Sequence, residues 1–301
     1  MRRRSANWTA LVSLAALLLL LQSCATPPRL AAVPSQDTAR AEIPGIPKAR
    51  YWVQTDIEPF VRDAIASGQR ERAYLARIGH KGPLPPINFL AVSGGGDDGA
   101  FGAGLLIGWT ETGTRPEFRG VTGVSTGALI APFAFLGPEE DAKLREVYTT
   151  IGPRNILLPR SLLVALTSDG LADNSPLFEL ISRHINAEFL ARIAGEYREK
   201  GRLLLVGTTN LDARRGVIWN MGEIAVAARD NPGAFPPVMI DVEVDDKPYQ
   251  EMHVDGGAQA QVFLYPPRMF DLIRQQGIKV NQRERSVYIC LLYTSPSPRD
   301  R

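Results

Sequence analysis

The chain has 301 residues, of which 45% are hydrophobic and 22% are charged, and this composition is typical of a globular protein with one sizeable core. Its formal net charge is +2, which becomes slightly negative if the three arginines at 2–4 are removed. Such a balanced charge excludes a general attraction to nucleic acid. Length and composition therefore predict one folded domain preceded by an N-terminal extension.

The first 23 residues have the layout of a secretory signal peptide. Arginines at 2–4 precede an apolar run from Trp8 to Leu21, and the run ends close to the small residue Ser23. The run is short for a membrane span, and prolines at 27 and 28 stop it abruptly. We therefore expect residues 1–23 to be removed on export.

The segment 21–24, Leu-Gln-Ser-Cys, resembles the lipobox of bacterial lipoproteins, in which the cysteine becomes the acylated first residue of the mature protein. The resemblance implies that Cys24 carries acyl chains that anchor the protein to a membrane. Ala25 favours the outer membrane of a Gram-negative cell, facing the periplasm or the exterior. The alternative is a plain signal or anchor helix with an unrelated cysteine. A lipidated Cys24 leaves Cys290 without a disulfide partner.

The remaining chain predicts a tether followed by an α/β domain. Residues 24–50 are rich in proline, alanine and serine, which indicates a tether, and Asp56 is a suitable N-cap for a helix that runs to Ile78. Strands and helices then alternate, which predicts a three-layer α/β fold over residues 51–289, with a mostly parallel sheet and helices on both faces. The predicted strands are 87–92, 118–124, 202–208, 217–220, 251–254 and 285–289, and the predicted helices are 99–112, 126–136, 141–149 and 176–200.

Residues 290–301 are unlike the end of a domain. The second half of this segment resembles a translated sequencing adapter. We therefore expect the native sequence to be cut off near Ile289, with the C-terminal part of the domain missing, and residues 290–301 to be a non-native tail.

A glycine-rich loop follows the first predicted strand. Gly94, Gly95 and Gly96 let several backbone N–H groups converge on one point, and the helix that begins at Gly99 adds the positive end of its dipole. Such a loop binds an anion, which is either a permanent one such as phosphate or the transient oxyanion of acyl transfer.

The second predicted strand ends in the pattern G-x-S-x-G, formed by Gly123, Ser125 and Gly127, and a helix follows at once. In this context the two glycines make room for a strained serine whose hydroxyl projects from the sheet. Parallel strands joined by one helix are usually adjacent, so Ser125 and the glycine loop are expected at the same edge of the sheet. A nucleophile beside backbone donors is what acyl transfer requires.

The base for this serine is expected to be Asp255. A short predicted strand delivers its carboxylate to a turn at Gly256 and Gly257, where the lack of side chains permits close approach of a ligand or another backbone segment.

The three histidines supply the competing hypothesis. His80 precedes the sheet in a loop, and His184 is expected on a solvated helix face. His253, together with Asp212 or Asp241, has the chain order of a Ser-Asp-His esterase, and this alternative stays open.

Together, the GGGxxG loop, the GxSxG elbow and the later DGG resemble the patatin-like phospholipases over about Ile87 to Pro267. The resemblance implies a fold related to, but distinct from, the α/β hydrolases, and a lipid or phospholipid as substrate. It also implies a Ser–Asp dyad of Ser125 and Asp255, with the amides of Gly94–Gly96 as oxyanion hole. No cofactor or metal is expected. The segments Gly170-Leu171 and Pro176-Leu177 would contribute to the acyl-chain cleft.

The chain departs from this family at Asp98, where the family usually has arginine or lysine. Asp97 and Asp98 are expected to cap the following helix, and their negative charge would weaken the stabilisation of an oxyanion. Neutral esters are therefore favoured over phosphate-headed substrates.

Two further hypotheses remain. The residues Gly94, Gly96 and Gly99 formally match a dinucleotide-binding fingerprint, but no acidic strand end follows at the required distance. A non-catalytic lipid-binding lipoprotein of the cell envelope would keep the fold and lose turnover.

Overall fold

The computed structural model describes residues 29–149, 158–159, 172–173, 181–230, 239–266, 268–277 and 283–292. Its strands are β1 (Arg50–Trp52), β2 (Ile87–Val92), β3 (Gly120–Val124), β4 (Leu158–Pro159), β5 (Ala172–Asp173), β6 (Leu203–Asn210), β7 (Arg215–Asn220), β8 (Met239–Val244), β9 (Lys247–Asp255) and β10 (Arg285–Cys290).

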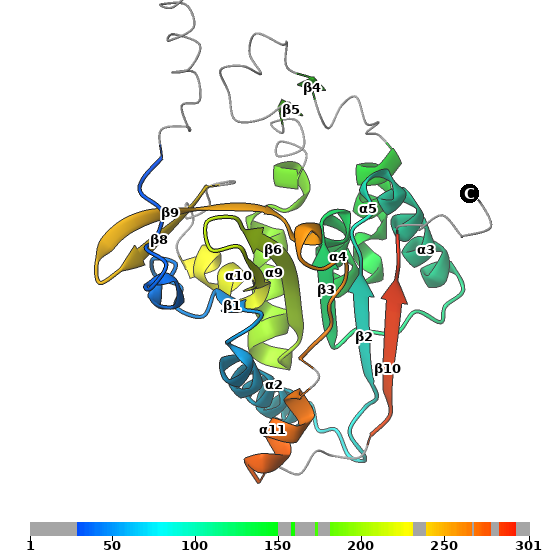
Figure 1. Ribbon diagram of the computed structural model, residues 1–301. Coiled ribbons are helices and arrows are strands. Elements are labelled where there is room, and N and C mark those ends of the chain that lie inside the picture. The colour runs from blue at the N-terminus through cyan, green and yellow to red at the C-terminus, as the bar shows by residue number, and fades with distance from the viewer. Residues whose placement is uncertain are drawn as a thin grey trace, which may run out of the picture.

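Eight of these strands form one sheet in the order β1-β7-β6-β3-β2-β10, and β9 joins it at β6 and carries β8 (Figure 1). The strands β10, β2, β3 and β6 are parallel to one another, whereas the pairings of β7, β1, β9 and β8 are antiparallel. The glycine loop and Ser125 follow the parallel strands β2 and β3, whereas Asp255 ends the antiparallel strand β9.

Helices cover both faces of the sheet, as predicted for a three-layer α/β fold. One face packs against α3 (Gly99–Glu111), α4 (Thr126–Leu136), α5 (Asp141–Thr149), α9 (Ala187–Lys200) and α10 (Met221–Asp230). The other face packs against α2 (Ile57–Arg77) and α11 (Met269–Gln275), which lie together at the lower end of Figure 1. No helix in the part of the chain that the structure describes combines the length and the apolar character needed to cross a bilayer.

The bounds of β2, α4 and α5 agree with the sequence prediction residue for residue. The helix predicted over 176–200 is interrupted, because residues 181–184 are helical but α9 begins only at Ala187, after a break at 185–186. The start of α9 is set by Asn186, whose side chain accepts the Phe189 N–H at 3.0 Å. Asp56 does precede α2, but its side chain accepts the Trp52 N–H at 2.9 Å instead of capping the helix.

The predicted tether is wrong for residues 29–50, which pack against the domain. Val33 and Ala41 are buried with Val242 and Val244 in one apolar cluster, and the main chain of Glu42 pairs with the β8 strand. Proline prevents regular helix here, but it does not prevent burial of the intervening apolar residues.

Residues 290–292, the start of the expected non-native tail, pack with the domain. Cys290 is the last residue of β10, and Leu292 is buried against the core. The Leu292 N–H donates to Ser93 Oγ at 2.8 Å, so the chain remains part of the packed domain at least to Leu292.

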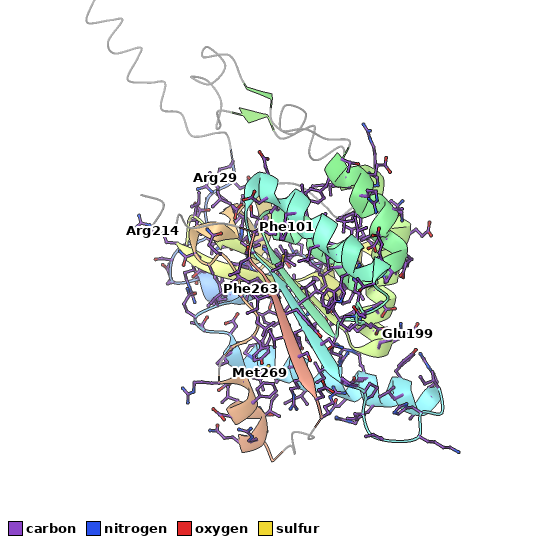
Figure 2. The ribbon with its side chains drawn as sticks, turned by 90° about the vertical axis from the view of Figure 1, so that its right-hand side faces the viewer. Arg29, Phe101, Glu199, Arg214, Phe263 and Met269 are labelled. Atoms are coloured by element: carbon purple, nitrogen blue, oxygen red, sulfur yellow. The ribbon has the colours of Figure 1, made fainter. Side chains whose placement is uncertain are left out.

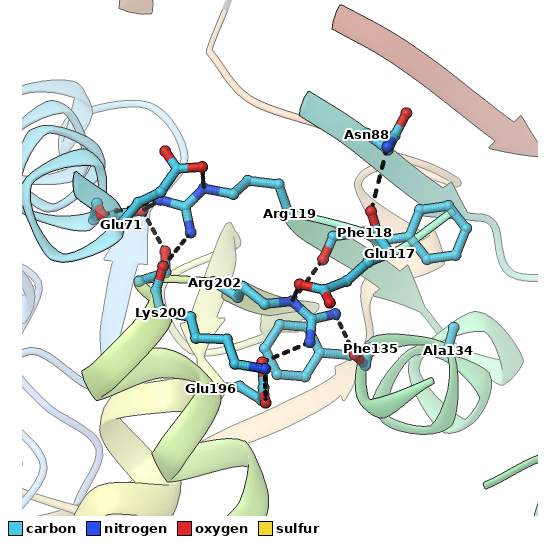
Figure 3. A network of polar contacts seen from close by, with 12 residues as sticks. Glu71, Asn88, Glu117, Phe118, Arg119, Ala134, Phe135, Glu196, Lys200 and Arg202 are labelled. Atoms are coloured by element: carbon cyan, nitrogen blue, oxygen red, sulfur yellow. Dashed lines mark hydrogen bonds and ion pairs between the residues drawn. The ribbon is translucent and has the colours of Figure 1, made fainter. Parts of the chain in front are cut away.

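Arg202, which is buried, and Arg119, which is partly buried, hold the beginning of the parallel strands against the ends of the helices (Figure 3). Arg202 donates to the main-chain oxygens of Phe118, at 2.8 Å, and of Phe135 in the last turn of α4. Arg119 donates to the main-chain oxygen of Lys200 at 2.8 Å, at the end of α9. The last carbonyls of a helix have no partner within it, so these bonds satisfy them. Because β3 starts beside Arg119 and β6 starts beside Arg202, these bonds also tie β3 to the end of α9 and β6 to the end of α4.

Candidate active site

Ser125 lies at a sharp turn between β3 and α4, in the strained conformation that a nucleophile elbow requires. Its φ of 53° and ψ of −125° place a non-glycine residue in a sparsely populated region. A methyl group on Gly123 would lie 2.4 Å from the Gly127 oxygen, and one on Gly127 would lie 2.4 Å from the Val92 oxygen. Only glycine therefore fits on either side of this serine.

The glycine loop lies against the serine. A methyl group on Gly94 would lie 3.1 Å from Ser125 Cβ, so the two residues are in contact. The Gly94 N–H, however, donates to the main-chain oxygen of Gln261 at 3.0 Å. Gly94 is therefore not available as the oxyanion donor that the sequence predicts, because its N–H already bonds within the protein.

Gly95 and Gly96 remain as candidate oxyanion donors. Among the described residues, neither of their N–H groups donates a hydrogen bond to another residue. Gly96 has a φ of +54°, which favours glycine, and a side chain on Gly95 would meet Leu292 at 2.5 Å. These two amides lie directly before α3, where the positive end of the helix dipole also favours an anion.

Asp97 and Asp98 do not cap α3 through their side chains, which corrects the expectation from the sequence. Asp98 occupies the N-cap position with helical φ and ψ angles but makes no side-chain capping bond. Both carboxylates are exposed, so water and salt reduce their effect on a charge at Ser125.

The pairing of β9 with β6 brings Asp255 to the same end of the sheet as Ser125. One edge of β6 is paired with β7, and the other edge is shared by β3 and β9. Val124 of β3 lies opposite Gly207, and Asp255 of β9 lies opposite the next residue, Thr208. The two strands therefore meet end to end, and Ser125 and Asp255 leave the sheet at neighbouring positions.

The turn after β9 holds the Asp255 carboxylate. The Gly257 N–H donates to Asp255 Oδ1 at 2.7 Å, which leaves Oδ2 to accept a proton from elsewhere. A methyl group on Gly256 would lie 2.4 Å from the Gly207 oxygen, so this turn approaches β6 too closely for any side chain. Within the described residues, Asp255 makes no hydrogen bond with Ser125, and such bonds often form only in the substrate complex.

Two residues near the site were missed by the sequence analysis. The side chain of Gln261 lies beside both Gly94 and Gly257. The Tyr148 hydroxyl is 2.9 Å from Thr126 Oγ1, next to the nucleophile. Burial raises the pKa of Tyr148 to about 12, although the bond with Thr126 opposes this shift, so the phenol stays neutral. Neither residue forms a local motif that could have revealed it.

His253 is buried and fully engaged in a network that does not include Ser125. Its Nε2 lies 3.0 Å from Glu251 Oε2, and its Nδ1 lies 3.0 Å from Thr208 Oγ1. Trp219 donates to the same Thr208 oxygen at 2.7 Å. Both ring nitrogens of His253 therefore have partners within this network, and neither is left for the serine.

The other members of a Ser-Asp-His triad are also occupied elsewhere. Asp212 binds Arg29 at 2.7 and 2.8 Å and accepts the Met252 N–H, and Asp241 accepts from Gln250 at 2.8 Å. His80 is exposed, with Nε2 at 2.9 Å from the Pro83 oxygen.

An apolar cavity of about 140 Å³ lies at the opposite end of the sheet. It is lined by the beginnings of the parallel strands, at Ile87, Gly120 and Leu203, and by side chains of α2 and α11. Figure 2 shows Phe263 over the middle of the sheet and Met269 below it, on α11. A side chain on Gly207 would meet the Phe263 ring at 2.9 Å, so this ring packs on the sheet at the residue that pairs with Val124.

Other predicted features lie outside the described residues. These are the signal peptide, Cys24, and the segments 170–171 and 176–177 of the expected acyl-chain cleft. In the described ranges, no three histidine, cysteine, aspartate or glutamate side chains come together to hold a metal ion.

Comparison with known proteins identifies the family. A family model described as patatin-like phospholipase matches residues 90–266, a range that contains the glycine loop, Ser125 and Asp255. No curated protein matches the chain. The family match covers more than half of the chain and agrees with its mixed α/β architecture, so this chain belongs to the patatin-like phospholipases.

Proposed function

We propose that the protein hydrolyses carboxylic esters of lipids through a dyad of Ser125 and Asp255. Membership of the patatin-like phospholipases supports lipid acyl hydrolysis in general. The observation that carries the dyad is the pairing of Val124 and Asp255 with consecutive residues of β6. It brings the strained serine and the carboxylate to one edge of the sheet, beside the glycine loop.

Acylation begins when Ser125 Oγ attacks the ester carbonyl carbon. Asp255 takes the hydroxyl proton, and the carbonyl oxygen becomes an oxyanion bound by the amides of Gly95 and Gly96. The intermediate collapses when Asp255 returns the proton to the alcohol, which leaves. The acyl chain then remains on Ser125 as an ester.

Deacylation repeats these events with water. Asp255 removes a proton from the water as its oxygen attacks the acyl-enzyme, and it then protonates Ser125 Oγ as the carbon–oxygen bond breaks. The fatty acid leaves and the free serine is restored.

Neutral ester groups are the substrates that this site suits best. The carboxylates of Asp97 and Asp98 lie at the start of α3, so an anionic group bound near the glycine amides would be repelled. Arginine or lysine at this position would attract a phosphate instead. A comparison of triacylglycerol, neutral monoester and phospholipid hydrolysis tests this preference.

The cell envelope is the proposed place of action. The lipobox-like segment before Cys24 supports export and lipid anchoring, which would hold the domain close to lipid substrates.

The proposed function is tested with a fluorophosphonate probe and a panel of lipid esters. The wild type and a Ser35→Ala control should be labelled and active, whereas Ser125→Ala should fold, resist labelling and lose ester hydrolysis. Full activity of Ser125→Ala would refute the assignment. An intact wild type that neither binds the probe nor hydrolyses any ester would instead favour a non-catalytic lipid-binding protein.

A further inference from the structure

The side chain of Gln261 lies between the proposed nucleophile and the proposed base. A methyl group on Gly94 would lie 3.1 Å from Gln261 Oε1 and 3.1 Å from Ser125 Cβ. A methyl group on Gly257 would lie 3.0 Å from Asp255 Oδ1 and 3.4 Å from Gln261 Nε2. The carboxamide is therefore next to both glycines that flank the reacting groups.

The backbone holds Gln261 in this place while its side chain stays open to water. The Gln261 main-chain oxygen accepts the Gly94 N–H at 3.0 Å, which joins the loop after β9 to the loop after β2. The side-chain amide makes only a long contact of 3.5 Å with the Gly257 oxygen, and the residue is exposed. Both polar atoms of the carboxamide are thus accessible to a small molecule bound beside Ser125 and Asp255.

A carboxamide suits the position of a water-orienting group. It offers one acceptor oxygen and two N–H donors, and it stays neutral, so it does not compete with Asp255 for a proton. A hydrolytic water needs one acceptor for the proton that it loses and a second for the proton that it keeps. Asp255 supplies the first of these acceptors.

We propose that Gln261 is a catalytic residue of deacylation, where its Oε1 accepts the second proton of the hydrolytic water in a hydrogen bond. This inference rests on the proposed Ser125–Asp255 function. The water oxygen bonds to the acyl carbon, one water proton passes to Asp255, and that proton later returns to Ser125 Oγ as the ester bond breaks. Gln261 keeps its protons throughout, and no other reactant is needed.

The path of the proton explains why Gln261 acts in deacylation and not in acylation. In acylation the proton moves from Ser125 directly to Asp255, so no water has to be oriented. Loss of the carboxamide should therefore leave acylation intact and slow the second step. A merely structural role would affect both steps, because it would disturb the glycine loop on which both depend.

Gln259 provides a matched control. It has the same side chain, is exposed on the same turn, and its Cβ packs near Gly216 instead of the glycine loop. Gln261→Met keeps the length of the side chain and the main-chain bond to Gly94, but removes both polar atoms. Gln261→Glu retains an acceptor oxygen and serves as a rescue variant.

The experiment measures the fraction of enzyme that carries an acyl group during turnover. Full-length protein is mixed with a short-chain 4-nitrophenyl ester and quenched in acid, and the acyl adduct on Ser125 is quantified by mass spectrometry. Gln261→Met should lower turnover by about 10- to 100-fold and raise the acylated fraction above those of wild type and Gln259→Met. Gln261→Glu should accumulate less adduct than Gln261→Met.

An unchanged or lower acylated fraction in Gln261→Met would overturn the proposal, even if turnover falls, since the loss would then lie in acylation. The result also separates this inference from the proposed function. If Ser125→Ala is inactive but Gln261→Met accumulates no adduct, only the role of Gln261 fails. If Ser125→Ala remains active, the dyad itself fails.

Discussion

Val124 and Asp255 pair with consecutive residues on one edge of β6, Gly207 and Thr208. Strand residues rise by about 3.3 Å, so the end of β3 and the end of β9 are separated by roughly one residue along this edge. Ser125 follows Val124 directly, and Gly256 lets the turn after Asp255 approach β6 without a clash. The proposed chemistry depends on this junction of two strands that are distant in the sequence.

Glycine at 123 is predicted to be essential for the elbow. In Gly123→Ala, the new methyl group would lie 2.4 Å from the Gly127 oxygen, which forces the main chain to shift. We expect a destabilisation of about 1–3 kcal/mol and at least 100-fold less ester hydrolysis. Gly104→Ala, where the methyl group meets nothing within 4 Å on α3, should be neutral or stabilising by about 0.5–1 kcal/mol. Urea denaturation checks both values, and equal behaviour of the two variants would contradict the elbow geometry.

His253 and Asp255 are predicted to respond differently to substitution. Asp255→Asn should retain the fold and lose roughly 10²- to 10⁴-fold in ester hydrolysis, because the proton acceptor is removed. His253→Ala should remove one hydrogen-bond partner from Thr208 and one from Glu251, which keep Trp219 and Arg50, and this loss costs about 1–3 kcal/mol of stability while the folded protein still hydrolyses esters. Turnover per folded molecule is the measurement. If His253→Ala abolishes turnover and Asp255→Asn does not, the Ser-Asp-His alternative is correct.

The buried Glu251 is predicted to make the protein sensitive to acid. Burial raises the pKa of Glu251, but hydrogen bonds from His253 and Arg50 outweigh this effect and hold the pKa below its ordinary value of 4.5. A carboxylate with a lowered folded-state pKa stabilises the fold above its unfolded-state pKa, and this contribution disappears as the pH falls through the folded-state value. The Tm should therefore fall below about pH 4.5, and less steeply in Glu251→Gln. Identical slopes for the two proteins would show that Glu251 does not contribute.

Cys24 is predicted to carry the membrane anchor. In a Gram-negative host, wild-type protein should incorporate radiolabelled palmitate and sediment with the outer membrane, because several acyl chains give stable anchoring. Cys24→Ser should incorporate no label and leave the membrane fraction, while Cys290→Ser should behave as wild type. Palmitate incorporation by Cys24→Ser would place the lipid on another residue and contradict the lipobox interpretation.

Local patterns in the sequence predicted the nucleophile elbow and the helix that follows it, whereas contacts between distant segments could not be predicted. The turn at Ser125 and the helix that follows it depend on residues close together in the chain, so their bounds could be predicted. The position of Gln261 depends on its bond to Gly94, and the His253 network depends on an ion pair between Arg50 and Glu251. No periodicity or spacing reports such pairings.

The wrong prediction of a tether has the same explanation. Residues 29–50 were expected to form a tether because their composition is rich in proline, but their few apolar residues are buried by β8, a strand that the sequence analysis did not predict. The helix α10, which the sequence analysis did not predict, follows β7 without a loop. The Asn220 side chain accepts the Gly222 N–H at 3.1 Å, so the helix starts at once. The burial of residues 29–50 depends on the tertiary context, whereas the cap of α10 is a local signal that the sequence analysis did not use.

The central claim is the convergence of the Ser125 hydroxyl, the Asp255 carboxylate and the Gly95 and Gly96 amides, and a crystal structure of the fluorophosphonate adduct tests it most directly. We predict phosphorus bonded to Ser125 Oγ, the phosphonyl oxygen within hydrogen-bonding distance of both amides, and Asp255 Oδ2 facing the modified serine. An adduct on another residue, or a phosphonyl oxygen turned away from the glycine loop with Asp255 out of reach, would contradict the account.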